Sequence, residues 1–232
     1  MKQLIIDTLL AGKLLPLFYE NSAETSVDIL RTMYKAGVRI VEYTNRGEHA
    51  LHNFKQLKAL QIAEMPGFYL GIGTIKSAKE AADFINIGAD FIVSPIVNPA
   101  VAGLCDQHDI LWIPGCMTPT EIYTAQQLNA PVIKLFPANI LGPAFISSIR
   151  ELFRGQLFIP TGGVEIAEEN LEQWFQAGVC AVGMGSKLIT KEIVLNRNYQ
   201  ELYLQTKRAL RMIESIAYDR KSRATTFENL NP

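Results

Sequence analysis

The sequence lacks three features that would assign it to a class at once: a long hydrophobic run, an excess of charge of one sign, and a pattern of cysteines. No apolar stretch in its 232 residues reaches the roughly 18 residues that a membrane-spanning helix needs. The formal net charge of -1 gives no broad attraction for nucleic acid or anionic lipid. The first residues lack a signal-peptide layout, because Asp7 interrupts a very short apolar stretch. We therefore expect a cytoplasmic protein without nucleic-acid or membrane partners.

The few cysteines and histidines exclude further classes. Cys105, Cys116 and Cys180 are odd in number, widely spaced and set among apolar residues, which favours buried thiols over disulfides or metal ligands. The three histidines form no metal-binding pattern either. We therefore expect neither a metal nor another cofactor. With 48% hydrophobic and 19% charged residues, the chain can bury one large core.

A weak internal repeat is the main structural signal. Helices that end on glycine or a similar breaker are followed at once by apolar runs, at 36–42, 87–93, 129–134 and 177–183. Helix-start signals follow the runs in turn: capping-box spacing at Ser77 with Glu80 and at Thr118 with Glu121, and prolines suited to a first helical position at Pro99, Pro119 and Pro143. The apolar runs are eight: about 14–18, 38–44, 69–74, 90–95, 110–114, 131–136, 156–161 and 179–184.

This alternation of strand and helix predicts parallel strands, and eight units suggest a single closed (β/α)8 barrel of the TIM type. A doubly wound open sheet is the alternative, and the two differ in whether the first and last strands pair. Leu4, Ile5, Leu9 and Leu10 indicate a short leading helix that covers one end of the barrel. We expect residues 1–190 to form the barrel.

Residues 191–232 are expected to form a helical extension and tail packed on the same domain. Apolar residues (Leu202, Leu210, Ile213 and Ile216) alternate there with basic ones (Lys207, Arg208, Arg211, Arg220 and Lys221). We interpret this as an amphipathic helix with a frayed end, whose basic residues form a solvated face. A contact with another subunit or a partner is the alternative.

A lone lysine, Lys134, lies within the apolar run 132–137. Such an amine either snorkels to solvent or performs chemistry, since a desolvated amine can be neutral near pH 7 and attack a carbonyl to form a Schiff base. On the strand at 38–44, Glu42 shares a face with the aliphatic residues before it, and this face is expected to point inward. Lys134 and Glu42 should therefore meet across the barrel mouth. They form either a catalytic proton-exchanging pair or a structural ion pair.

Other candidates follow neighbouring strands, where barrel enzymes gather their chemistry. Arg46 could hold a substrate carboxylate with its guanidinium fork, and Thr74 could add a hydroxyl to the same anion. Ser94-Pro95 and Pro114-Gly115 are expected to shape the pocket wall. The last two strands end in Pro160-Thr161-Gly162-Gly163 and Gly183-Met184-Gly185-Ser186, and glycines there would let backbone amides approach a phosphate.

Taken together, the ordered motifs resemble the 2-keto-3-deoxy-6-phosphogluconate (KDPG) and 4-hydroxy-2-oxoglutarate (KHG) aldolases, over roughly residues 14–190. The motifs are Glu42-x-Thr44-x-Arg46, Gly71-x-Gly73-Thr74, Val93-Ser94-Pro95, Pro114-Gly115-x-x-Thr118-Pro119-Thr120-Glu121, Lys134-x-Phe136-Pro137-Ala138 and Pro160-Thr161-Gly162-Gly163. That family is a lysine-imine aldolase barrel, typically a homotrimer, that needs no metal. The resemblance implies that Lys134 is the Schiff-base lysine and Glu42 the general acid/base. It implies substrate contacts from Arg46, Thr74, Pro95, Phe136, Thr161, Gly162, Gly163, Gly185 and Ser186.

The resemblance also implies a reaction: cleavage of KDPG to pyruvate and glyceraldehyde 3-phosphate, and of KHG to pyruvate and glyoxylate. The chain departs from the family where Asn45 and Gly47 flank Arg46, since many members have an aliphatic residue before the arginine and Thr or Ser after it. It also has Gly-Met-Gly-Ser at 183–186 where many members have Gly-Gly-Ser. A galactonate-derived epimer or another sugar-acid phosphate is an alternative substrate. A phosphate-binding barrel isomerase or epimerase, and a non-catalytic sugar-phosphate-binding protein, are alternative functions.

Overall fold

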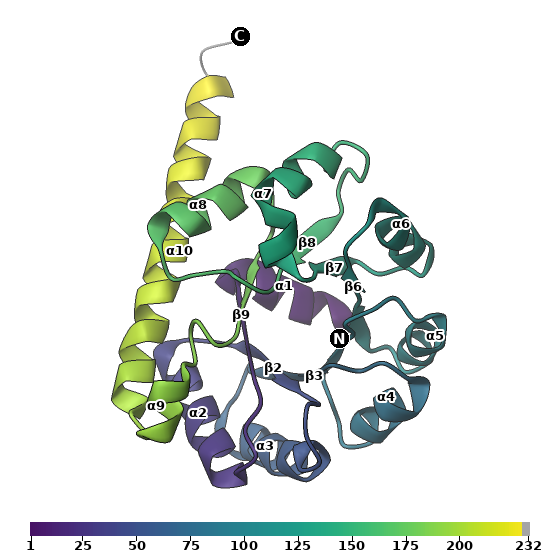
Figure 1. The fold of residues 1–232 in the computed structure, drawn as a ribbon, viewed down its shortest axis with the longest axis vertical. Coiled ribbons are helices and arrows are strands. Elements are labelled where there is room, and N and C mark those ends of the chain that lie inside the picture. The colour runs from purple at the N-terminus through teal and green to yellow at the C-terminus, as the bar shows by residue number, and fades with distance from the viewer. Residues whose placement is uncertain (229–232) are drawn as a thin grey trace.

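Strands and helices alternate along the chain in the computed structural model, which describes residues 1–228 and the surroundings of side chains up to residue 218 (Figure 1). The strands are β1 (Leu14–Phe18), β2 (Ile40–Thr44), β3 (Tyr69–Gly73), β4 (Phe91–Val93), β5 (Leu111–Ile113), β6 (Gly115–Cys116), β7 (Val132–Leu135), β8 (Leu157–Pro160) and β9 (Val182–Met184). Each of the eight apolar runs of the sequence contains a strand, and the fifth continues past Pro114 as the separate short strand β6.

All strand pairs are parallel, and the strands close into a barrel. Six strands pair in the order β5-β4-β3-β2-β1-β9 and three in the order β6-β7-β8. The chain itself joins β5 to β6, and a bridge between Thr161 and Gly183 joins the end of β8 to β9. The first and last strands pair, with Leu14 opposite Val182. This pairing confirms the (β/α)8 barrel and rules out the open doubly wound sheet.

Helices surround the barrel, and α4, α5 and α6 begin at the residues that the sequence predicts. They are α1 (Lys2–Gly12), α2 (Ala23–Ala36), α3 (Ala50–Glu64), α4 (Ala78–Ile85), α5 (Pro99–Gln107), α6 (Pro119–Gln127), α7 (Ala138–Ile149), α8 (Glu168–Ala177), α9 (Lys191–Leu195) and α10 (Tyr199–Glu228). Both predicted capping boxes form, with Ser77 and Thr118 as caps. Pro143 follows a kink at Gly142 inside α7, so it starts the second part of that helix. Within residues 1–228, no helix has the length and apolar character needed to span a bilayer.

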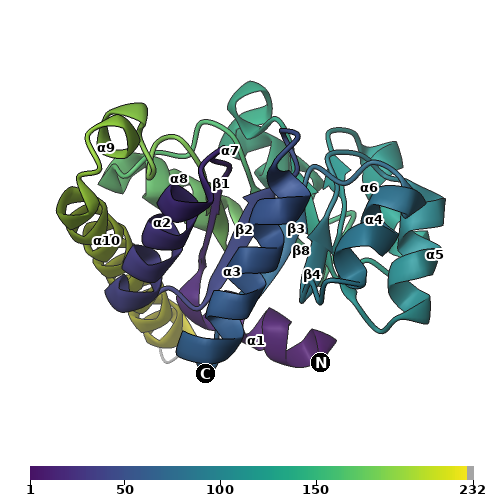
Figure 2. The same ribbon diagram turned by 90° about the horizontal axis from the view of Figure 1, so that it is seen from below.

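Side chains on the strands separate into an inner and an outer apolar cluster. Inside the barrel, Leu15, Ile40 and Ile159 pack together with Ile5 and Leu9 of the leading helix α1. Figure 2 shows α1 at the end of the barrel opposite α9. Leu4 was expected on the covering face of α1 but is 60% exposed, and Ile6 is buried instead. Helix α1 therefore plugs the end at which the strands begin and leaves the other end open.

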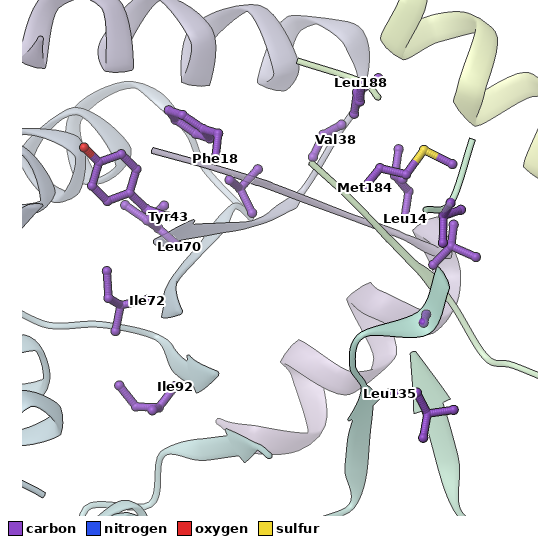
Figure 3. Close-up of a cluster of buried hydrophobic side chains, with 14 of the residues drawn as sticks. Leu14, Phe18, Val38, Tyr43, Leu70, Ile72, Ile92, Leu135, Met184 and Leu188 are labelled. Atoms are coloured by element: carbon purple, nitrogen blue, oxygen red, sulfur yellow. The ribbon is translucent and has the colours of Figure 1, made fainter. Parts of the chain in front are cut away.

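Outward-facing side chains of the same strands form the larger cluster with the surrounding helices. Figure 3 shows part of it, including Leu14, Phe18 and Tyr43 from the first two strands. The rings of Phe18 and Tyr43 meet edge to face, with centroids 5.2 Å apart. This outer layer joins the strands to the helices around them.

The long helix α10 packs against both α2 and α8, and its later residues run on beyond the ring of helices (Figure 1). Leu202, Ile213 and Ile216 are buried against the outer cluster, whereas Arg208 and Arg211 are exposed. The amphipathic character predicted for this segment is confirmed up to residue 218. The side chains of the two further basic residues, at 220 and 221, and the tail 229–232 lie outside the described parts of the chain.

Candidate active site

Lys134 and Glu42 meet inside the barrel, as strand alternation predicts. The Lys134 Nζ atom lies 3.3 Å from Oε2 and 3.4 Å from Oε1 of Glu42. The side chains are 9% and 1% exposed, so both ends of this pair are largely removed from water. Lys134 also has its Nζ atom 5.6 Å from the centre of the Phe136 ring. The amine is therefore held between a carboxylate and an aromatic face rather than extended into solvent.

A cavity of about 360 Å³ opens next to this amine at the carboxyl ends of the strands. Lys134 lines the cavity. Glu42 does not line it, but its carboxylate contacts the Lys134 amine. The nine predicted substrate-binding residues all line the same cavity: Arg46, Thr74, Pro95, Phe136, Thr161, Gly162, Gly163, Gly185 and Ser186. A larger cavity of about 520 Å³ lies between α1 and α10 at the other end and contains none of these residues.

Two sides of the cavity suit anions. On one side, Arg46 follows β2 and Thr74 follows β3, which places a guanidinium and a hydroxyl on adjacent strands. On the other side, Gly162 and Gly163 have φ values of 100° and 74°, a conformation that side chains rarely adopt. The buried Thr161 hydroxyl has no hydrogen-bond partner within the described residues. An unpaired buried hydroxyl beside such a loop is available to a ligand.

Part of the predicted pocket wall has another role. Pro95 lines the cavity, but Ser94, Pro114 and Gly115 do not. The buried Ser94 hydroxyl accepts a hydrogen bond of 2.9 Å from the indole of Trp112. A Cβ on Gly115 would lie 2.6 Å from the Pro95 carbonyl oxygen, so this glycine allows two strand ends to approach. Ser94, Pro114 and Gly115 therefore lie outside the cavity lining, where Ser94 and Gly115 make packing contacts.

Several lining residues are missed by the sequence analysis. Tyr19 and Glu20 follow β1, and Lys187 and Lys191 follow β9. No local motif marks them, although every strand of a barrel contributes its carboxyl end to the open face. Lys187 forms a 2.5 Å ion pair with Glu165 at the rim. These positions become candidates if every residue that directly follows a predicted strand is considered, whether or not it belongs to a motif.

Gly73 also affects the site, and it does so through its contact with Glu42. A Cβ at position 73 would lie 2.5 Å from Cδ and 2.7 Å from Cγ of Glu42. The absence of a side chain therefore creates the space in which the Glu42 carboxylate approaches Lys134. The sequence contains Gly73 within a motif, but nothing local shows which side chain it accommodates.

Comparison with known proteins agrees with this geometry. A family model described as "KDPG and KHG aldolase" matches residues 5–205. The chain belongs to this aldolase family. It is 28% identical over 211 residues to the 2-dehydro-3-deoxy-phosphogluconate aldolase of Treponema pallidum, covering 90% of this chain and 97% of the relative. It is also 29% identical over 133 residues to the 2-dehydro-3-deoxy-6-phosphogalactonate aldolase of Escherichia coli, covering 57% and 64% of the two chains.

Solved structures are similar over nearly the whole aldolase chain. A crystal structure of a 4-hydroxy-2-oxoglutarate/2-dehydro-3-deoxyphosphogluconate aldolase has a TM-score of 0.77 at 31% identity, covering 90% of this chain and 98% of the other. The KDPG aldolase of Legionella pneumophila, solved with pyruvate captured as a covalent carbinolamine, has a TM-score of 0.79 at 23% identity, with coverage of 87% and 96%. This second similarity concerns the fold.

Proposed function

We propose that this aldolase cleaves KDPG to pyruvate and glyceraldehyde 3-phosphate through a lysine imine, and that it also cleaves KHG to pyruvate and glyoxylate. The observation that carries the proposal is the pairing of an amine with a carboxylate at 3.3 Å beside a cavity that suits anions at two sides. A structural ion pair alone does not require a cavity at its amine. The position of Lys134 on that wall therefore favours catalysis over the structural alternative.

The first half of the reaction builds an electron sink on Lys134. Its amine attacks the C2 carbonyl of the substrate and loses water to give a protonated imine. Glu42 takes the proton of the C4 hydroxyl through a water molecule, and the C3–C4 bond breaks with its electron pair flowing toward the imine. An aldehyde leaves and an enamine remains. Proton transfer of this kind contributes about 10²–10⁴ in rate.

The second half returns the enzyme to its starting state. The enamine is protonated at C3, and water hydrolyses the resulting imine to release pyruvate and the free Lys134 amine. In this proposal Arg46 and Thr74 hold the pyruvyl carboxylate, and Gly162, Gly163 and Ser186 hold the phosphate. The remaining residues of the predicted set line the same cavity: Pro95, Phe136, Thr161 and Gly185.

The galactonate-derived epimer is a second candidate substrate. The similarity to the E. coli phosphogalactonate aldolase supports it, at an identity close to that of the phosphogluconate aldolases. The two substrates differ in configuration at C4, the carbon whose hydroxyl the proposal assigns to Glu42. Measuring kcat/KM for both epimers on one preparation decides between them.

The test of the imine mechanism is reduction with borohydride in the presence of pyruvate, followed by peptide mass spectrometry. We expect one pyruvyl adduct, on Lys134, and none on Lys58. Lys58 is a matched control because it is the other buried lysine among the described residues, paired with Asp90 at 3.0 Å but away from the cavity. Lys134→Ala should lose adduct and cleavage, and Glu42→Gln should mainly slow turnover. Cleavage that survives in Lys134→Ala would refute the mechanism.

The family resemblance also supports two proposals about assembly and localisation: we propose that the protein is a homotrimer and that it acts in the cytoplasm. Light scattering coupled to size-exclusion chromatography measures the mass of the assembly directly. A mass of one or two chains at micromolar concentration would exclude the trimer.

A further inference from the structure

The turn that follows β1 lies between the two loops to which the proposed function assigns the ends of the substrate. In the barrel, β1 is between β9 and β2, and its turn therefore separates the Ser186 loop from the Arg46 loop. Tyr19 and Glu20 of this turn line the cavity together with Ser186 and Arg46. If the two outer loops hold the phosphate and the carboxylate, then the β1 turn faces the hydroxyl-bearing carbons between them.

The turn is held rigidly from outside the cavity. The backbone carbonyl of Glu20 accepts hydrogen bonds from the Tyr43 hydroxyl at 2.8 Å and the Asn53 amide at 2.9 Å. The same Asn53 amide donates to the Asn21 carbonyl at 3.0 Å. Tyr43 and Asn53 are 0% and 1% exposed, so their positions are set by the packed core. The backbone of Glu20 is therefore fixed before any substrate arrives.

The Glu20 side chain, in contrast, has no partner within the described part of the chain. Its carboxylate makes no hydrogen bond and no ion pair with the described residues, although it is partly buried. Burial raises the pKa of this carboxyl. A partly desolvated carboxylate that has no donor among the described residues is open to a hydrogen bond from a ligand hydroxyl.

We propose that Glu20 is a specificity residue that accepts a hydrogen bond from the C5 hydroxyl of the substrate's aldehyde half. The inference rests on the proposed function. A carboxylate attracts a hydroxyl donor and repels a second anion at the same place. KDPG has a hydroxyl at C5, whereas KHG has a carboxylate carbon there. Glu20 thus favours hydroxylated aldehydes over glyoxylate as the second product.

The test compares kcat/KM for the two substrates in wild type, Glu20→Gln and Glu20→Ala. We expect kcat/KM for KDPG to fall at least tenfold in Glu20→Ala, because a hydrogen bond to a charged group is lost. For KHG it should stay constant or rise in both variants. For the C4 epimer of KDPG, kcat/KM should fall by the same factor as for KDPG, since Glu20 acts at C5. Trapping of pyruvate on Lys134 should be unchanged, because pyruvate lacks this hydroxyl.

Stability separates this role from a structural one. Since folding raises the pKa of Glu20, the ionised form is disfavoured in the folded state at pH values above that pKa. Glu20→Gln should therefore be at least as resistant to urea as wild type at pH 7 while losing substrate preference. Glu24→Gln is the matched control: Glu24 is on α2, exposed, paired with Arg197 at 3.4 Å and outside the cavity. Glu24→Gln should leave the ratio of kcat/KM for KDPG to kcat/KM for KHG unchanged.

The outcomes distinguish the two proposals. If wild type forms no pyruvate adduct and cleaves neither substrate, the proposed function fails. If adduct and cleavage are intact but both Glu20 variants keep the wild-type ratio of KDPG to KHG, the role of Glu20 is refuted. Gln has the size and shape of Glu. If Glu20→Ala fails to fold, Glu20→Gln can therefore still be compared with wild type.

Discussion

Replacing Gly73 by alanine tests whether the proposed function of the Lys134–Glu42 pair depends on the space around Glu42 as well as on the identity of the two residues. The substitution removes no functional group. The Gly73 φ is not in the left-handed region, so the backbone accepts alanine. The new methyl, however, would lie 2.5 Å from Cδ of Glu42, whereas carbon atoms pack best at about 3.5–4.0 Å. The Glu42 carboxylate must therefore retreat by about 1 Å.

That displacement sets the expected size of the effect. A misplacement of about 1 Å can reduce the rate about 10²-fold when geometry controls the reaction. We therefore expect kcat for cleavage to fall by about 10² in Gly73→Ala. Lys134 remains in place, so the variant should still form the reducible adduct with pyruvate. Overpacking of this kind should also lower the free energy of unfolding of the variant by about 1–3 kcal/mol, which a urea titration measures.

Gly71→Ala is the matched control on the same strand. There the added methyl would meet the ring of Phe91 in the inner cluster instead of Glu42. It should destabilise the fold by a similar amount without affecting turnover. The assay is pyruvate release per adduct-forming site, which counts only folded enzyme. Equal turnover per site in Gly73→Ala and wild type would refute the argument that Gly73 positions Glu42.

Two further predictions concern parts of the chain away from the cavity. Burial raises the pKa of each of the three cysteine thiols to about 12; iodoacetamide at pH 8 should therefore react about 10³-fold more slowly with the folded protein than with the urea-unfolded chain. Burial alone would raise the pKa of Glu121, but hydrogen bonds from the amides of Met117 and Thr118 and from the Thr118 hydroxyl lower it overall. Since the folded pKa lies below the unfolded one, this carboxylate stabilises the fold above the unfolded pKa and loses that contribution as the pH falls through the folded pKa. Glu121→Gln should lower the free energy of unfolding, measured in urea, by about 1 kcal/mol at pH 7, and this difference should shrink as the pH falls from the unfolded pKa to the folded one. A difference that does not change with pH would contradict this.

The fold could be predicted because its signals are local and repeat eight times. A helix breaker followed by an apolar run marks a β/α junction, and a capping box such as Ser77 with Glu80 marks the next helix. The meeting of Lys134 and Glu42 could also be predicted, since alternation along a strand fixes which side chains face inward. The positions of Tyr19 and Glu20 on the cavity wall, and of Gly73 against Glu42, could not, because they depend on which strands and loops become neighbours around the ring.

The glycine after Arg46 illustrates the same limit. In the sequence, Gly47 is only a departure from the Thr or Ser common in the family. In the structure, a Cβ at position 47 would lie 2.6 Å from Cζ of Tyr19, whose hydroxyl donates a 2.6 Å hydrogen bond to Asn21. Gly47 and Tyr19 are therefore linked, because the ring occupies the space that a side chain would need. The departure next to Arg46 is thus matched by Tyr19, 28 positions earlier in the turn that follows β1, and the ring of Tyr19 packs where a side chain at position 47 would lie.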